Sequence, residues 1–277
     1  MEINKLHFVT AGTPRKAEGK GYQAAFDVIK SMNLDGMELE FVHGVRMADT
    51  SKEVVKQARN NGLIFTAHGP YYINLNAKEP EKIDASIKRI LDTAILTNEL
   101  GGYSITFHAA FYMGKDKQTV FDNVKKSFEI ISEELEKQNN KIWVRPETTG
   151  KGTQWGDVDE VIAISKGFDT ILPCIDFSHL HARSNGLYNT YDEFCQVFEK
   201  IGNKLGQRAL DNFHAHIAGI NYTEKGERNH LNLEESDMNY KDLLKAFKDF
   251  NVKGVVVCES PNIEDDTQLL KEYYMSL

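Results

Sequence analysis

Short apolar runs and amphipathic stretches alternate along the chain. Apolar runs bounded by glycine, proline or polar residues are typical of buried strands. We place such strands at residues 5–11, 36–42, 63–68, 103–108, 141–147, 171–175, 212–218 and 254–259. Between them apolar residues recur at helical spacing, which predicts helices over residues 22–32, 50–60, 79–100, 120–137, 158–165, 191–201, 240–250 and 265–274. Thr50 and Glu53 resemble a capping box before the second of these helices. The segment between the seventh strand and Asn239 is interpreted as a long polar loop.

The strict alternation of strands and helices defines the expected fold class. Such an order implies parallel strands joined by right-handed crossovers. Eight strand–helix units within 277 residues have the size of a (β/α)8 TIM barrel. We therefore predict an α/β chain that forms a single TIM-barrel domain over residues 1–277. A doubly wound open sheet is the alternative.

Composition narrows the class of protein. The chain is 41% hydrophobic and 27% charged, which is ordinary for a soluble globular domain, and no apolar run approaches the length needed to cross a bilayer. A net charge of −8 argues against binding polyanions through a broad basic surface. Three cysteines without CxxC pairing are typical of reduced thiols, and no hydrophobic signal region follows Met1. We expect a cytoplasmic protein, a monomer, without membrane contact.

The candidate chemistry lies where the strands end. Six consecutive strands finish at residue types that bind metal ions: His68, His108, Glu147, Asp176, His214 and Glu259. A single strand-end carboxylate or imidazole is usually solvated or paired with the backbone. Six that converge at one barrel rim would leave buried charges unpaired, so their convergence predicts a metal cluster.

The number of candidate ligands exceeds the needs of one ion. His179 follows Asp176 by three residues, and His230 lies in the loop after the seventh strand. A catalytic zinc takes about three protein ligands, so this set favours two or three ions with carboxylates that bridge them. The remaining histidines, His7, His43, His181 and His216, are interpreted as structural or solvated. Of these, His216 is the strongest further candidate, because it shares a strand face with His214.

Four segments resemble the endonuclease IV family of abasic-site DNA endonucleases. They are His68-Gly-Pro-Tyr71-Tyr72-Ile-Asn74-Leu75, Glu147-Thr-Thr-Gly150-Lys-Gly152-Thr, Cys174-Ile-Asp176-Phe-Ser-His179 and Glu259-Ser-Pro261-Asn262. With His108 and His214 in register, the resemblance spans most of the chain, and both the order and the spacing of the motifs agree.

The resemblance implies a zinc-dependent repair enzyme that acts on double-stranded DNA containing abasic sites. It implies cleavage of the phosphodiester bond 5′ to the abasic site by a metal-activated hydroxide, with Glu147 and Glu259 as catalytic carboxylates. It also implies three zinc ions, with Mn²⁺ as a further option at some positions. Their ligands would be His68, His108 and Glu147; Glu147, Asp176, His214 and Glu259; and His179 and His230 with one further carboxylate.

The sequence departs from the family pattern at the third zinc site. The family places an aspartate two residues before its histidine, where this chain has Arg228, and arginine cannot ligate a metal. We expect Glu227 to complete the site and Arg228 to point outward, to solvent or to a DNA phosphate. His108 is followed by Ala-Ala instead of Pro-Gly, and the family's Gly-x-His-x-Ser opening is absent, which indicates a divergent branch.

Rim residues outside the ligand set are candidates for DNA contact. Tyr71 and Tyr72, on the loop with Asn74, are expected to insert into the base stack at the damaged site. Arg46, after the second strand, is a candidate for a phosphate contact or for filling the gap.

Two other classes of function remain open. A divalent-metal sugar isomerase or epimerase of the xylose isomerase-like group would need only Glu147, Asp176, His214 and Glu259. A binding protein on an inactive barrel is the third reading. Metal content separates the first two, because about three zinc ions favour the nuclease whereas one or two manganese or magnesium ions favour the isomerase.

Overall fold

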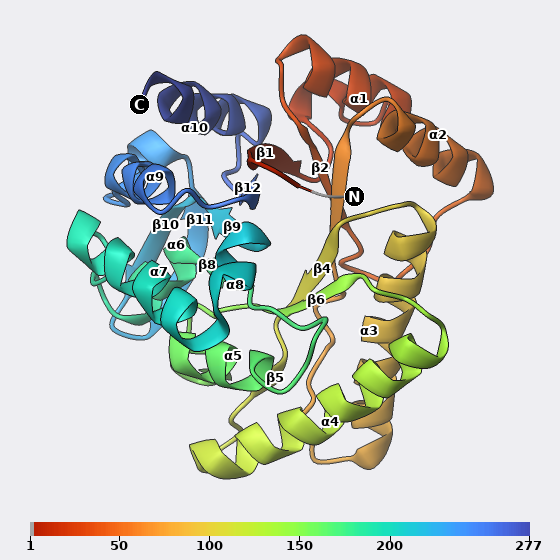
Figure 1. Cartoon of the computed structure of the whole chain (residues 1–277), viewed down its shortest axis with the longest axis vertical. Helices are drawn as coiled ribbons and strands as arrows, with labels where there is room; N and C mark the ends of the chain where they lie inside the picture. Colours follow the sequence, from red (N-terminus) through yellow and green to blue (C-terminus); the bar gives the residue numbers. More distant parts are fainter. Residues whose placement is uncertain (1–2) are drawn as a thin grey trace.

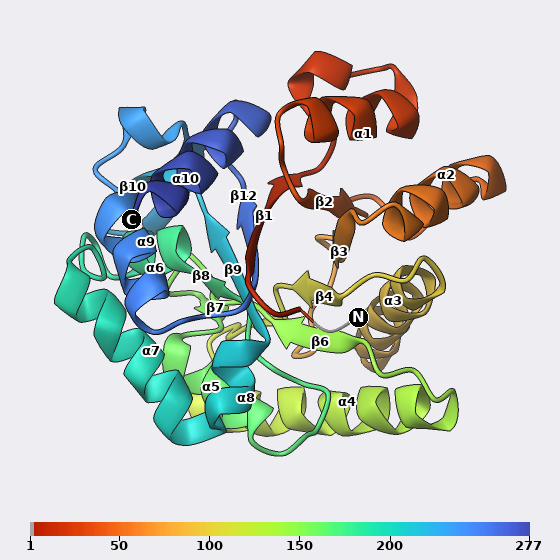
Figure 2. The same cartoon turned by 45° about the horizontal axis from the view of Figure 1, so that its top comes forward.

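The strands form one parallel sheet that curls into a barrel. The computed structural model describes residues 3–277, and its main sheet has eight strands in the order β6-β4-β3-β2-β1-β12-β9-β8. The two outer strands, β6 and β8, approach each other through the parallel bridges Val144–Ile171 and Glu147–Cys174. Figures 1 and 2 show the helices around the outside of the curled sheet, with α1–α4 on one flank of the barrel and α5–α10 on the other. The predicted TIM barrel is therefore confirmed, and the open-sheet alternative is wrong.

The barrel strands are short and separated by helices. The strands are β1 (Leu6–Ala11), β2 (Gly36–Glu40), β3 (Ile64–His68), β4 (Ser104–Phe107), β6 (Trp143–Pro146), β8 (Ile175–Asp176), β9 (Phe213–Ile217) and β12 (Gly254–Cys258). The α-helices are α1 (Gly21–Ser31), α2 (Asp49–Asn60), α3 (Pro80–Glu99), α4 (Lys117–Lys137), α5 (Val158–Ser165), α6 (Phe177–Arg183), α7 (Tyr191–Leu205), α8 (Gln207–Asp211), α9 (Tyr240–Asp249) and α10 (Glu264–Ser276). Two 3-10 turns, Arg15–Ala17 and Leu233–Glu235, complete the helical segments.

Two small antiparallel sheets of two strands each lie outside the barrel, and only the second is a hairpin. One pairs β5 (Ala110–Phe111) with β7 (Gln154–Trp155), and the other pairs β10 (Gly219–Thr223) with β11 (Gly226–Leu231). The hairpin corrects the prediction of an irregular polar loop before Asn239. Exposed polar strands carry no apolar alternation, so the hydrophobic pattern gave no signal for them.

Three local predictions differ from the structure. The second helix begins at Asp49, and its N-cap, Ala48, makes no side-chain hydrogen bond, so the capping box expected at Thr50 is absent. The sixth barrel strand is reduced to β8, because Ile171 and Cys174 form only isolated bridges. Helix α6 begins directly after β8, and the Asp176 side chain caps it by accepting the His179 backbone N–H.

Apolar packing lies between the sheet and its helices. Phe26 of α1 packs on Phe65 of β3 with ring centroids 5.3 Å apart. Phe177 of α6, Phe198 of α7 and Phe247 of α9 pack against one another. The barrel interior is different, because buried polar residues, among them Glu38, point into it. Within residues 3–277, no helix combines the length and apolar character needed to cross a membrane.

Candidate metal centre

The carboxyl ends of the barrel strands bring the candidate ligands together. His68 and Asp176 are the last residues of β3 and β8, Glu147 and Glu259 directly follow β6 and β12, and His108 directly follows β4. Because the strands are parallel, these ends meet at one rim. Three groups there hold their ligand atoms within 4.8 Å of one another: His68, His108 and Glu147; Glu147, Asp176, His216 and Glu259; and Asp176, His179 and His230.

The first group joins two imidazoles to one carboxylate. His68 Nε2 lies 3.2 Å from one oxygen of Glu147, and His108 Nε2 lies 3.3 Å from the other. His68 Nδ1 donates a hydrogen bond to the Gly69 carbonyl at 2.7 Å. Since that partner only accepts, Nδ1 carries a proton, which leaves Nε2 as the atom that can bind an ion.

The second group shares Glu147 with the first. His216 Nδ1 lies 3.2 Å from a Glu259 oxygen and 3.5 Å from a Glu147 oxygen. Its other nitrogen, Nε2, lies 3.1 Å from Glu38, a buried carboxylate on β2. The ring therefore offers Nδ1 to the rim.

The third group is built on the turn between β8 and α6. One oxygen of Asp176 caps α6, and the other lies 3.0 Å from His179 Nδ1. His179 Nε2 points the other way and lies 3.6 Å from Glu227 of β11. Gly150 permits this approach, because a Cβ there would lie 2.6 Å from the Glu227 carboxylate and 3.0 Å from the His179 ring.

The structure places His216, and not His214, beside the rim carboxylates. His216 is level with Asp176 in the register between β9 and β8, whereas His214 lies deeper in the barrel. There His214 contacts Ser104 Oγ at 2.9 Å and Glu38 at 3.2 Å, and it groups with Cys174 and His216 instead of with Glu147, Asp176 and Glu259. The assignment of His214 as a ligand is thus at odds with the geometry.

Sequence reasoning also missed Glu38. It lies between Met37 and Leu39 in a strand with apolar residues on one face, so alternation alone directs its side chain into the barrel interior. That inward direction was a usable signal, as was the shared strand face for His216.

Electrostatic coupling in the cluster is strong. Burial opposes charging of the imidazoles, but Glu147 beside His68, and Asp176 with Glu147 beside His179, raise the pKa of both rings to about 10. Burial and neighbouring carboxylates raise the pKa of Asp176 to about 8. Against the effect of burial, His216 and His214 hold the pKa of Glu38 below its usual range, so Glu38 is ionised. Without metal, protons on the histidines therefore balance the carboxylates.

The donor set fits divalent metal ions. Asp176 Oδ2, His216 Nδ1 and His230 Nε2 are buried and have no hydrogen-bond partner, and each belongs to one of the rim groups. Buried polar atoms are rarely left without a partner, and these combine imidazole nitrogen with carboxylate oxygen. Such mixed ligands suit zinc or manganese.

The rim residues proposed to contact DNA occupy different surroundings. Tyr71 and Tyr72 are 66% and 63% exposed, and the Tyr71 ring lies 6.1 Å from the His68 ring. Asn74 uses its side-chain oxygen to accept the backbone N–H groups of Asn76 and Phe111, so it joins two rim loops. Arg46 lines a cleft with α2 and α3.

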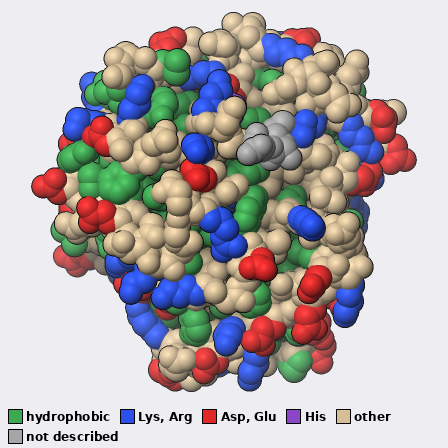
Figure 3. Space-filling view, in the orientation of Figure 1, with side chains coloured by type: hydrophobic (Ala, Val, Ile, Leu, Met, Phe, Trp, Pro, Cys, Tyr) green, Lys and Arg blue, Asp and Glu red, His purple; other side chains and the backbone are tan. Residues whose placement is uncertain are grey.

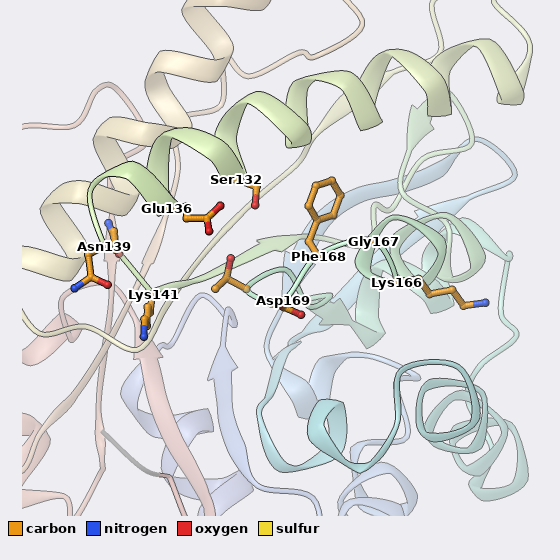
Figure 4. A pocket seen from close by; sticks show the side chains of 10 residues that line it. Ser132, Glu136, Asn139, Lys141, Lys166, Gly167, Phe168 and Asp169 are labelled. Carbon is orange, nitrogen blue, oxygen red and sulfur yellow. The ribbon is translucent and has the colours of Figure 1, made fainter.

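Two clefts lie at opposite ends of the barrel, and only one of them is near the candidate ligands. One of about 650 Å³ lies beside the third group and is lined by Lys151, Arg183, Lys225, Glu227 and Arg228 among others. Another, of about 590 Å³, lies at the amino ends of the strands between α4 and the loop after α5, remote from the metal ligands (Figure 4). The face in Figure 3 mixes acidic and basic side chains without a continuous basic patch.

The structure is a TIM barrel with a cluster of candidate metal ligands at one rim, and comparison with known proteins identifies the family. Residues 26–274 match the xylose isomerase-like TIM barrel family, so the chain belongs to that family. An uncharacterized protein of Methanocaldococcus jannaschii is 45% identical over 98% of both chains. Apurinic-apyrimidinic endonuclease 1 of Plasmodium falciparum is 24% identical over 98% of this chain and 47% of its own length.

Solved structures of two functional classes share the fold. A D-tagatose 3-epimerase-like protein superposes with a TM-score of 0.75 at 18% identity and covers 97% of this chain and 98% of its own. Endonuclease IV from Thermus thermophilus superposes with a TM-score of 0.70 at 16% identity and covers 99% of this chain and 100% of its own. At these identities the likeness concerns the fold, so the choice between the two reactions rests on the site.

Proposed function

We propose that this chain is a zinc-dependent phosphodiesterase that cleaves DNA on the 5′ side of abasic sites. The observation that carries the proposal is the linkage of three ligand groups through shared carboxylates. Glu147 belongs to the first and second groups, and Asp176 belongs to the second and third. A sugar epimerase would use only the middle group, which leaves His68, His108, His179 and His230 without a role.

The candidate ligands would hold up to three metal ions. The first would take His68, His108 and Glu147, the second Glu147, Asp176, His216 and Glu259, and the third His179 and His230 with Asp176 or Glu227. Closely spaced ions supply an activated water and neutralise charge on a phosphate. His108, His230 and Glu227 are the least buried members of the set, so the cluster opens to the rim on their side.

The rim supplies means of holding nucleic acid. The exposed Tyr71 ring lies near His68, and the exposed Tyr72 follows it on the same loop, where an aromatic side chain can stack on a base beside an abasic gap. Arg228, Lys225 and Lys151 line the cleft beside Glu227 and can contact backbone phosphates. This local positive charge, with that of bound ions, would offset the net charge of −8.

A sugar epimerase is the second candidate, and one observation favours it. Glu147, Asp176, His216 and Glu259 form a compact group on their own, and a D-tagatose 3-epimerase-like protein shares the fold with a TM-score of 0.75. In that reaction Glu147 and Glu259 would act as acid and base on a carbon beside a carbonyl.

A cleavage assay tests the proposal. The purified protein is incubated with a duplex oligonucleotide that carries a single tetrahydrofuran abasic analogue, with and without chelator, and then with added zinc. We expect incision on the 5′ side that chelator abolishes and zinc restores. An intact duplex of the same sequence is the substrate control. Absence of incision by zinc-loaded protein, together with C3 epimerisation of ketoses under manganese, would overturn the proposal in favour of the second candidate.

A further inference from the structure

A carboxylate lies buried directly beneath the rim ligands. Glu38 is on β2, and its side chain crosses the barrel interior to β9. One oxygen lies 3.1 Å from His216 Nε2, and the other lies 3.2 Å from His214 Nε2. Thr66 of β3 donates its hydroxyl hydrogen to the second oxygen at 2.7 Å. Glu38 therefore holds two histidines of one strand at the same time.

The contact with Glu38 determines what His216 offers to the rim. An ionised carboxylate only accepts hydrogen bonds, so the nitrogen that faces it must carry a proton. For His216 this is Nε2, which leaves the lone pair on Nδ1. That atom has no hydrogen-bond partner and lies 3.2 Å from Glu259 and 3.5 Å from Glu147. The ring is thus oriented with its open nitrogen toward the second ligand group.

The same carboxylate has the opposite effect on His214. Its Nε2 lies 3.2 Å from Glu38 and 3.3 Å from His216 Nε2, and its Nδ1 lies 2.9 Å from the Ser104 hydroxyl. Both nitrogens are satisfied by protein groups, and the side chain is fully buried. His214 has no nitrogen left for an ion, although it lies on the same strand face as His216.

We propose that Glu38 is a positioning residue that fixes the tautomer and orientation of His216, so that Nδ1 binds the ion held by Glu147, Asp176 and Glu259, and that it withholds His214 from coordination. This inference rests on the metal centre of the proposed function but not on the identity of the reaction. Outer carboxylates that orient a ligating histidine typically change metal affinity by about 10–100-fold when removed.

The wild-type protein provides a direct test. Protein labelled with ¹⁵N-histidine is loaded with ¹¹³Cd²⁺ as the probe, and the ring resonances of His216 and His214 are assigned with single substitutions. We expect His216 to show its proton on Nε2 and ¹¹³Cd coupling at Nδ1, and His214 to show no coupling. Coupling at His216 Nε2, or at either nitrogen of His214, would overturn the inference.

Substitutions give a second, independent test through zinc affinity, measured by competition with a chromophoric chelator. Glu38→Leu removes both acceptors, so we expect the affinity of the weakened site to fall about 10–100-fold. Glu38→Gln keeps one acceptor oxygen for His216 and should recover most of the loss. Thr66→Val removes the hydroxyl hydrogen bond to Glu38 and leaves both histidine contacts in place, so it serves as the matched control with little change in zinc affinity.

Different results would overturn the proposed function and the role of Glu38. Thermal unfolding of each metal-free variant shows whether it folds, and the spectra of the wild-type protein decide the question if Glu38→Leu does not. A wild-type protein that binds no zinc or cadmium at the rim overturns both the proposed function and the role of Glu38. Metal bound with unchanged affinity in a folded Glu38→Leu variant overturns the role of Glu38 alone.

Discussion

Glu147 is the residue at which two ligand groups meet. Its two oxygens lie 3.2 and 3.3 Å from His68 and His108, and the first group shares it with His216 and Glu259 of the second. In Glu147→Gln a neutral amide would replace an anion between two cations. We expect zinc content to fall and metal-dependent turnover to drop by more than about 100-fold, the upper end of losses for outer-shell changes. Atomic absorption and a single-turnover assay measure both.

The control for Glu147→Gln is the same chemical change at an exposed glutamate. Glu136 lines the cleft at the amino ends of the strands, remote from the rim ligands (Figure 4). Glu136→Gln should leave zinc content and turnover unchanged. Wild-type turnover in Glu147→Gln would show that this residue does not bridge two ions.

Glu227 and Arg228 are neighbours with different expected roles. The Glu227 carboxylate lies 3.6 Å from His179 Nε2, whereas Arg228 is exposed beside the rim cleft. Glu227→Ala should lower zinc content from about three to about two ions per chain and slow the reaction, because Asp176 is shared with the second group and His179 and His230 alone fall short of a usual ligand set. Arg228→Ala should keep its zinc but bind DNA more weakly, with a shallower salt dependence. Equal zinc content in the two variants would refute this division.

At the scale of elements, a bulge in the β10–β11 hairpin places Glu227 beside His179, where we propose that it completes the third ligand group. Asn221 pairs with Asn229, and Tyr222 pairs with Glu227, so Arg228 is the extra residue. Residues 227 and 230 of a regular strand would face opposite sides, because successive side chains alternate. The bulge shifts that alternation by one position, so Glu227 faces the same side as His230.

The bulge yields a prediction about chain length. Deletion of Arg228 would leave a regular hairpin with Glu227 two residues before the histidine, so both side chains would still share a face. We therefore expect the deletion variant to keep its full zinc content. Insertion of one alanine after Gly226 changes the length of the hairpin but not the number of residues between Glu227 and His230. It serves as a control for hairpin length. Loss of one zinc only in the deletion variant would show that side-chain alternation alone does not align the two residues.

The elements also show what the sequence could and could not predict. Strand alternation and the residue type at each strand end were sufficient for the barrel and for the positions of His68, His108 and Glu147, because parallel strands bring these ends together. The choice between His214 and His216 depends on the stagger between β9 and β8, which pairs Asp176 with His216. The stagger between two strands follows from the packing of the whole barrel, so the pattern of apolar and polar residues within one strand does not predict it.

For the whole molecule, the buried carboxylates of the candidate ligand cluster need positive charge beside them. Protons on histidines supply it in the metal-free protein, and bound metal ions would supply it in their place. His68 and His179, with pKa values of about 10, hold protons in the metal-free protein at neutral pH. An ion that binds there must displace them, so metal binding releases protons and strengthens as pH rises. The metal-free and metal-loaded proteins should therefore depend on pH in opposite directions.

Denaturation at several pH values tests this opposition. In the metal-free protein, the folded-state pKa of about 10 for His68 and His179 lies above the usual value of 6.5. Their stabilising contribution is thus complete below about pH 6.5 and is lost as pH rises toward about 10. Asp176 acts in the same direction, because the folded chain keeps its proton up to about pH 8. We expect the urea midpoint of chelator-treated protein to fall between pH 6.5 and 9, and that of zinc-loaded protein to hold or rise. Parallel curves for the two forms would contradict the exchange of protons for metal at the rim.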